Sequence, residues 1–206
     1  MNTRSILSLI VIASASASHA AMLTFHGSVG GKHQAVNINF MGNGHTYNAG
    51  AMDASLDGGA HFEAYCVDLF HSVGNGDTYA VNIKPMSMQG PNGNRAAWLF
   101  NTYAASVNSN QLGAALQLAI WDVISDNGDG FDVGDFKSSE GGSLRTLADS
   151  YLSASTGMTG SAYWLEAQSH GERDNRNQNL MTAVPEPSSI AAIAVGALTL
   201  LRRSKK

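Results

Sequence analysis

The sequence predicts an α+β fold, in which an antiparallel β-sandwich-like part carries a helical insertion. A signal peptide precedes this domain and a short C-terminal hydrophobic helix follows it. Three observations predict this arrangement in the 206-residue chain. Both ends have the composition of targeting segments, short alternating segments broken by glycine follow the first end, and two proline-free, Ala-rich segments come later.

Residues 1–20 are typical of a secretory signal peptide. Arg4 supplies the positive charge, residues 6–13 form a short apolar run, and residues 14–20 are mostly small. This order of zones predicts cleavage after Ala20. A buried N-terminal helix or strand is the alternative.

The other end begins with Val184-Pro185-Glu186-Pro187, continues through apolar residues 190–201, and closes with Arg202-Arg203 and three further residues. The prolines end the folded domain before Pro185. Twelve helical residues span only about 18 Å, which is short for a bilayer crossing, and the cations favour retention at the cytoplasmic face.

This order of PEP motif, apolar stretch and Arg-Arg closely resembles the PEP-CTERM sorting signal, which is also catalogued as an ice-binding protein C-terminal domain. The resemblance covers residues 184–206. It implies an envelope protein of a Gram-negative bacterium that an exosortase handles at the PEP motif, often in connection with exopolysaccharide or biofilm matrix. The ice-related label says nothing about the activity of this chain.

Residues 21–183 form the predicted exported domain. It carries seven Lys and Arg against fifteen Asp and Glu, a net charge of −8. This charge argues against a nucleic-acid partner, because binding phosphates needs clustered cations. A single cysteine excludes an internal disulfide and a Cys-rich zinc site.

The first part of the domain is predicted to be β-structure. Alternation predicts strands at residues 22–26 and 33–40, separated by glycine turns. A stronger strand covers residues 61–70, and residues 77–84 are expected to be its hairpin partner after the turn at Gly74-Asn75-Gly76.

Helices are predicted next, because the apolar period changes. Residues 95–107 and 111–124 have helical length, with Asn110 as the N-cap of the second segment. The second helix is apolar nearly all round, which indicates burial within the domain. Residues 143–152 predict a further helix, residues 162–168 a last strand, and residues 171–179 a polar stretch that leads into a linker.

Cys66 and Gln117 occupy settings in which they could carry chemistry. Alternation places Cys66, Asp68 and Phe70 on one strand face, and Gln117 lies in the middle of the apolar helix. A buried carboxamide without partners costs roughly 1–3 kcal/mol, so the fold must satisfy it or use it. The ordinary interpretation is a small core cysteine and a glutamine bonded to nearby backbone.

The alternative hypothesis is that the two side chains react with each other. A thiol held against a carboxamide in a dry pocket can displace ammonia and form a thioester between Sγ of Cys66 and Cδ of Gln117. An external amine or hydroxyl would then open this bond and become attached to the former glutamine. Such chemistry requires rigid elements that hold both groups in position.

The segments Tyr65-Cys66-Val67-Asp68, Ala96-Ala97-Trp98 and Ala115-Leu116-Gln117-Leu118-Ala119-Ile120-Trp121-Asp122 together resemble the bacterial thioester domain. In that family, found in surface proteins of Gram-positive bacteria, a Cys is paired with the Gln of a Thr-Gln-x-x-Ile-Trp segment. The resemblance implies that Cys66 and Gln117 are the cross-linked pair, supported by Tyr65, Asp68 and Trp121. Leu116 stands where the family motif has Thr, and the sorting signal is of a different type.

Other kinds of site fit less well. A carboxylate at Asp68 is expected to raise the pKa of the thiol, which disfavours a Cys-protease nucleophile. His61 and His71 fall on the opposite strand face and are interpreted as ordinary strand-end residues. No GxSxG, HExxH or P-loop motif occurs, so we expect no enzyme, no cofactor and no resident metal. Loose Ca²⁺ binding at residues 126–132 stays open, because the EF-hand register puts Ser125 and Phe136 at the end positions.

Two functions follow from these patterns. The first is an exported cell-surface or matrix protein that attaches covalently to an amine or hydroxyl through the Cys66–Gln117 thioester. The second is a non-covalent exopolysaccharide, biofilm-matrix or structural surface protein, which would bind through exposed Trp and Tyr. In both, the C-terminal segment contacts the membrane and exosortase-type machinery is a partner.

Overall fold

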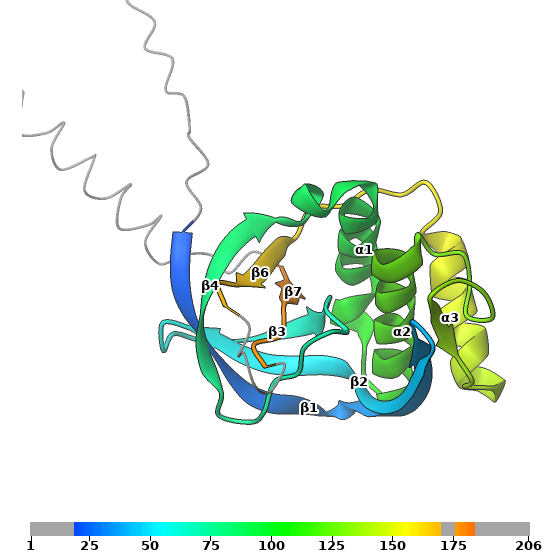
Figure 1. Cartoon of the computed structure of the whole chain (residues 1–206), viewed down its shortest axis with the longest axis horizontal. Helices are drawn as coiled ribbons and strands as arrows, with labels where there is room; N and C mark the ends of the chain where they lie inside the picture. Colours follow the sequence, from blue (N-terminus) through cyan, green and yellow to red (C-terminus); the bar gives the residue numbers. More distant parts are fainter. Residues whose placement is uncertain (1–18, 170–175, 184–206) are drawn as a thin grey trace, which may run out of the picture.

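The structure is a computed structural model, and it describes residues 19–169 and 176–183 (Figure 1). Most of the predicted signal peptide and the whole predicted sorting segment with its hydrophobic helix therefore lie outside the described residues. Within the described part, no helix combines the length and apolar character needed to cross a membrane.

One antiparallel sheet dominates the described chain. Its strand order is β2-β3-β7-β6-β4-β1-β5, and β1 also pairs with β2, so the sheet curls and closes on itself through the β1–β2 pairing. The mixed helix-and-strand class is confirmed, and the expected sandwich-like part is this single curled sheet. The strands are β1 (His19–Phe40), β2 (Asn43–Leu56), β3 (His61–Cys66), β4 (Thr78–Pro85), β5 (Phe136–Ser138), β6 (Tyr163–Ala167) and β7 (Leu180–Thr182).

Strand β1 replaces two expected strands with one long, bent strand. Its register against β2 shifts near Gly27 and again between Ser28 and His33. Gly27 has φ +117°, which a side-chain-bearing residue rarely adopts. These bulges bend the strand, so its first half pairs with β4 and its last residues pair with β5. The pairing starts at His19, before the predicted cleavage point.

Three predictions about the sheet were wrong. Strand β3 ends at Cys66 and does not continue to Phe70, which is exposed. Strand β4 pairs with β1 and β6, so it is not the hairpin partner of β3. The polar stretch before β7 was expected to lead directly into a linker, but the chain returns as β7, a buried strand between β3 and β6.

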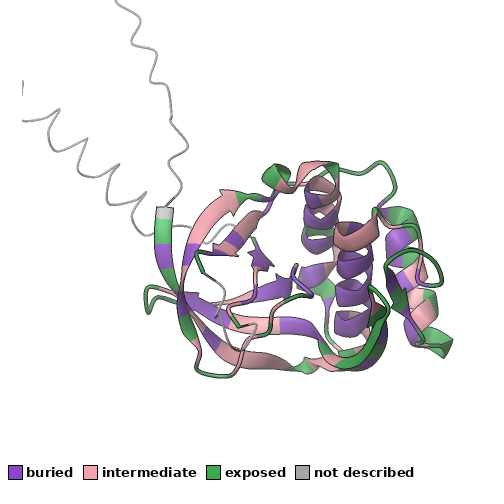
Figure 2. Ribbon diagram, in the orientation of Figure 1, coloured by how far each residue is buried: buried purple, intermediate pink, exposed green. Residues whose placement is uncertain are grey.

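The helices pack together beside the sheet. Helix α2 lies between the sheet and its two neighbours, and Figure 2 shows it buried on nearly every side, as its apolar sequence predicted. Its N-cap is Ser109 instead of Asn110, because the Ser109 hydroxyl accepts the Leu112 N–H at 3.3 Å. The helices are η1 (Met86–Gln89), α1 (Gly90–Tyr103), η2 (Ala104–Ser106), α2 (Asn110–Asp126) and α3 (Gly142–Ala154).

Candidate functional site

Helix α2 approaches strand β1 unusually closely at Gly113. A Cβ atom at this residue would lie only 1.9 Å from the main-chain oxygen of Lys32. Glycine therefore allows the helix backbone to contact the strand directly. One turn later, the same approach places Gln117 against the end of β3, where its side chain is 1% exposed.

The carboxamide of Gln117 forms two hydrogen bonds with the main chain of Cys66. Its Nε2 donates to the Cys66 carbonyl at 2.8 Å, and its Oε1 accepts the Cys66 N–H at 3.0 Å. Cys66 pairs with Leu180 of β7 as well, so the carboxamide occupies the place of a neighbouring strand. The structure thus brings the two sequence-predicted residues into direct contact, through the main chain of one and the side chain of the other.

The thiol of Cys66 is buried beside this contact. Its Sγ donates to the Asp68 carbonyl at 3.0 Å and accepts the Asp68 N–H at 3.3 Å. Burial raises the pKa of the Cys66 thiol to about 12, and the negative charge of Asp68 adds a smaller contribution in the same direction. The Asp68 charge has the expected sign, but the hydrogen bond with the Asp68 main chain lowers the thiol pKa by more than this charge raises it, so burial is the cause of the raised pKa. At neutral pH the sulfur is a protonated thiol.

Trp121 lies one helical turn after Gln117 and borders the thiol. Its indole N–H lowers the thiol pKa somewhat, yet it is buried and makes no hydrogen bond of normal geometry with any described group. The Trp121 ring contacts Tyr47 at 6.0 Å and Phe136 at 6.2 Å between ring centroids. Trp121 thus belongs to an aromatic cluster, and its indole N–H is the donor of this cluster that borders the buried sulfur.

Asp68 has a different position from the one predicted. Because β3 ends at Cys66, strand alternation does not extend to Asp68 or to His71. The Asp68 carboxylate accepts the Phe70 N–H at 3.0 Å and bonds Nδ1 of His71 at 2.7 Å. His71 is therefore a partner of Asp68, and its assignment to the opposite strand face was wrong. The pair fixes the turn that follows Cys66.

Tyr65 packs in the core with its side chain fully buried. Its ring contacts Phe100 of α1 edge-on at 5.8 Å, and burial raises the pKa of its phenol. The hydroxyl has no hydrogen-bond partner among the described groups. This position explains the aromatic residue before Cys66 as a contact that joins β3 to α1.

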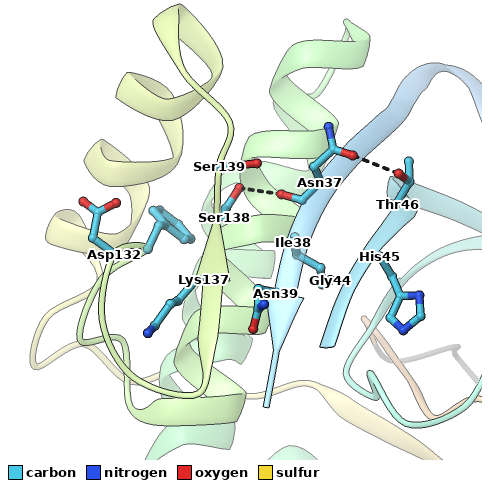
Figure 3. Close-up of a pocket in the computed structure, with 11 residues that line it drawn as sticks. Asn37, Ile38, Asn39, Gly44, His45, Thr46, Asp132, Lys137, Ser138 and Ser139 are labelled. Atoms are coloured by element: carbon cyan, nitrogen blue, oxygen red, sulfur yellow. Dashed lines mark hydrogen bonds between the residues drawn. The ribbon is translucent and has the colours of Figure 1, made fainter. Parts of the chain in front are cut away.

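An open depression of about 680 Å³ lies on another part of the surface, between the β1–β2 hairpin and β5 (Figure 3). Its rim carries amide and hydroxyl groups, among them Asn37, whose Oδ1 accepts from Thr46 at 2.8 Å. No tryptophan or tyrosine lines it, and none of these residues in the chain is exposed, all of them lying within the described ranges. The prediction of exposed Trp and Tyr for glycan binding was therefore wrong.

Comparison with known proteins identifies one segment of the chain. Residues 183–206 match the PEP-CTERM protein-sorting motif. This match indicates export to the cell envelope or surface of a Gram-negative bacterium, with exosortase processing. The matched segment contains the residues that were assigned to the sorting signal from the sequence, namely Pro185, Glu186, Pro187, Arg202 and Arg203. These five residues lie outside the described ranges.

No curated protein and no solved structure matches the chain. The resemblance of the exported domain to thioester domains therefore gains no support from relatives and depends on the quoted motifs. Sequence reasoning missed Tyr47 in the aromatic surroundings of the thiol, because Tyr47 lies in a segment without a recognisable motif. It also missed Gln178, which donates to the carbonyls of Asp68 at 3.0 Å and His71 at 2.7 Å.

Proposed function

We propose that this chain is an exported surface protein in which Cys66 and Gln117 form an internal thioester that captures a surface amine or hydroxyl. The observation that carries the proposal is the paired hydrogen bonding of the Gln117 carboxamide to the main chain of Cys66 in the buried core. The protein acts through one covalent attachment, so it is not a turnover enzyme.

Formation of the bond uses groups that already lie in the buried core. The sulfur leaves its contact with the Asp68 carbonyl and attacks Cδ of Gln117. Negative charge develops on Oε1, which already accepts the Cys66 N–H at 3.0 Å, so this N–H stabilises the tetrahedral intermediate. The thiol proton passes to Nε2, the C–N bond breaks, and ammonia leaves. The products are a Cys66–Gln117 thioester and one free ammonia.

Opening of the bond reverses the roles of these groups. An external amine attacks Cδ, the C–S bond breaks, and the amine proton passes to the sulfur. The unused indole N–H of Trp121 borders the sulfur and can stabilise the charge that develops on it. The external molecule ends in an amide bond to the former Gln117, and Cys66 is again a thiol. A hydroxyl would give an ester by the same route.

Intact-mass spectrometry of the full chain tests this proposal. We expect a species that is lighter than the sequence by one ammonia, and its mass should rise by one methylamine after methylamine treatment, with a thiol released. Cys66→Ala and Gln117→Leu should each have the full mass of their own sequence, without loss of ammonia, and should form no methylamine adduct. Gln178→Leu, which changes another buried glutamine, should keep the ammonia loss. Wild-type protein of full mass, with a thiol that can be titrated, would end the covalent proposal.

A second candidate is a non-covalent matrix or structural surface protein on the same scaffold. It is favoured by the fact that both polar atoms of the Gln117 carboxamide already have partners, so the residue has a structural role without any reaction. The polar depression in Figure 3 would then be the site for an exopolysaccharide. In this case, Cys66→Ser would leave cell attachment and matrix binding intact.

A further inference from the structure

Three carboxylates converge where helix α2 ends. Asp122 and Asp126 lie one turn apart on the helix, and Asp129 follows in the loop. One carboxylate oxygen from each residue lies within 4.8 Å of the other two. Oxygens on opposite sides of a calcium ion are about 4.6–5.2 Å apart, because each Ca–O bond is about 2.3–2.6 Å. The three residues can therefore share one ion.

Two of these carboxylates, one on a buried residue and one on a half-buried residue, each have a buried oxygen without a hydrogen bond. Asp122 is completely buried, and its Oδ2 accepts the Gly130 N–H at 3.3 Å. Oδ2 of Asp126 accepts the Phe136 N–H at 2.8 Å. The Oδ1 atom of each residue is buried and has no hydrogen-bond partner in the described chain. A buried carboxylate oxygen without a donor is costly, so these two atoms require either a cation or a proton shared between the carboxylates.

The nearby arginine does not neutralise the cluster by direct contact. Arg95 directs its N–H groups to the carbonyls of Asn127 and Leu152 and to the hydroxyl of Ser155, at 2.7–2.9 Å. It hydrogen-bonds none of the three carboxylates among the contacts of the described residues. Arg145, the other arginine near the loop, pairs with Asp132 and Asp149 instead.

The loop packs closely against the cluster at Gly134. Gly134 has φ +74°, and a Cβ atom there would lie 2.2 Å from Oδ2 of Asp126 and 2.9 Å from Oδ1 of Asp129. Asn127, Gly128 and Gly130 also have positive φ. Carboxylates from a helix and an irregular loop suit the flexible coordination of Ca²⁺ better than the strict octahedron of Mg²⁺.

We propose that Asp122, Asp126 and Asp129 form a binding site for one divalent cation, with Ca²⁺ the preferred ion. The site differs from the EF-hand register considered from the sequence, because two of its ligands come from successive turns of a helix. It is independent of thioester formation. Its ligands need only the hard oxygen donors that calcium prefers, and extracellular calcium modules commonly bind in the range of about 0.1–1 mM.

A bound ion would fix the chain between α2 and β5. Asp126 already holds the N–H of Phe136, and the Phe136 ring packs against Trp121. The ion would therefore stabilise one of the aromatic walls beside the Cys66 thiol. The competing arrangement is a proton shared between Asp122 and Asp126, which needs no metal ion.

Thermal unfolding of the full chain tests the site, after chelator treatment and dialysis, with added CaCl₂ or MgCl₂. We expect the melting temperature to rise by about 4 °C when Ca²⁺ is at ten times its dissociation constant, and to rise less with Mg²⁺. The variants are Asp129→Asn at the exposed ligand and Asp122→Asn at the buried one. Asp132→Asn is the matched control, because this loop carboxylate is exposed and pairs with Arg145.

The proposal predicts that Asp129→Asn raises the Ca²⁺ concentration needed for half of the thermal stabilisation by roughly tenfold or more. Asp122→Asn should abolish the stabilisation by Ca²⁺. Asp132→Asn should respond like the wild type. Three results would each overturn the site: no calcium response of the wild type up to roughly 10 mM, an unchanged response in Asp129→Asn, or stabilisation by acid alone with none by calcium, which would indicate the shared proton. Equilibrium dialysis with Ca²⁺ gives an independent measure, and about one ion per chain is expected.

Discussion

Opening the proposed thioester with methylamine should destabilise the folded protein, and the size of this effect depends on the number of residues between Cys66 and Gln117. Cys66 and Gln117 are 51 residues apart in sequence. A covalent link between them closes a loop of this length in the unfolded chain and lowers its entropy. By the relation used for disulfides, such a loop stabilises the folded state by about 4 kcal/mol at 25 °C.

Methylamine removes this link but leaves the Gln117 side chain as a secondary amide in the same place. We therefore expect the free energy of unfolding to fall by about 4 kcal/mol after treatment. This change corresponds to a decrease of about 8–16 °C in melting temperature for a domain of this size, and to a decrease of about 2 M in the urea midpoint.

Urea unfolding followed by tryptophan fluorescence measures the change, with each sample divided into treated and untreated halves. The Cys66→Ala variant is the control, because it cannot form the link and should unfold identically in both halves. Identical urea midpoints for treated and untreated wild-type protein would refute the reasoning, and so would an equal shift in Cys66→Ala.

Further substitutions test individual contacts. Trp121→Phe keeps the ring but removes the indole N–H beside the sulfur, so the ammonia loss should persist while methylamine opens the bond about tenfold more slowly, measured by timed mass spectra. Gly113→Ala places a Cβ atom 1.9 Å from a main-chain oxygen of β1, so it should lower the free energy of unfolding, measured in urea, by about 2 kcal/mol or more. Gly44→Ala is the control, because open space surrounds Gly44 and the free energy of unfolding should change little. In a Gln117→Leu background the thiol is free, with its folded-state pKa raised from 9.0 to about 12. Above pH 9.0 the unfolded thiol loses its proton while the folded thiol keeps it, so rising pH favours unfolding by up to about 1.4 kcal/mol per pH unit. Adding Cys66→Ala should remove this part of the pH dependence, and equal slopes in urea titrations of the two variants would contradict it.

Periodicity predicted the helices well and strand pairing poorly. The apolar run around Gln117 is buried over its whole length, because a helix of that composition needs apolar neighbours on every side. The pairing of β4 could not be predicted, since hairpin logic joins strands that are adjacent in sequence. The bulges in β1 bend it so that it pairs with β4 instead. Strand β7 was missed because three residues carry no readable alternation.

The candidate site divides in a similar way. Cys66 and Gln117 could be singled out because a lone thiol and a carboxamide within an apolar helix are unusual residues in their settings. The role of Asp68 could not be predicted, because the strand ends two residues before it and its carboxylate turns to His71. The convergence of Asp122, Asp126 and Asp129 was not predicted, because the sequence was compared only with an EF-hand loop, whereas two of these carboxylates belong to the helix.

The position of β7 has a mechanical consequence. This strand is bonded to β3 on one side, where Leu180 pairs with Cys66, and the matched sorting segment begins directly after Thr182. A target joined to Gln117 would pull on a side chain that is hydrogen-bonded to the Cys66 main chain. A pulling force between the target and the envelope would therefore act mainly on the contacts from Gln117 through Cys66 to β7. Most of the sheet and the helices α1 and α3 would carry little of this force.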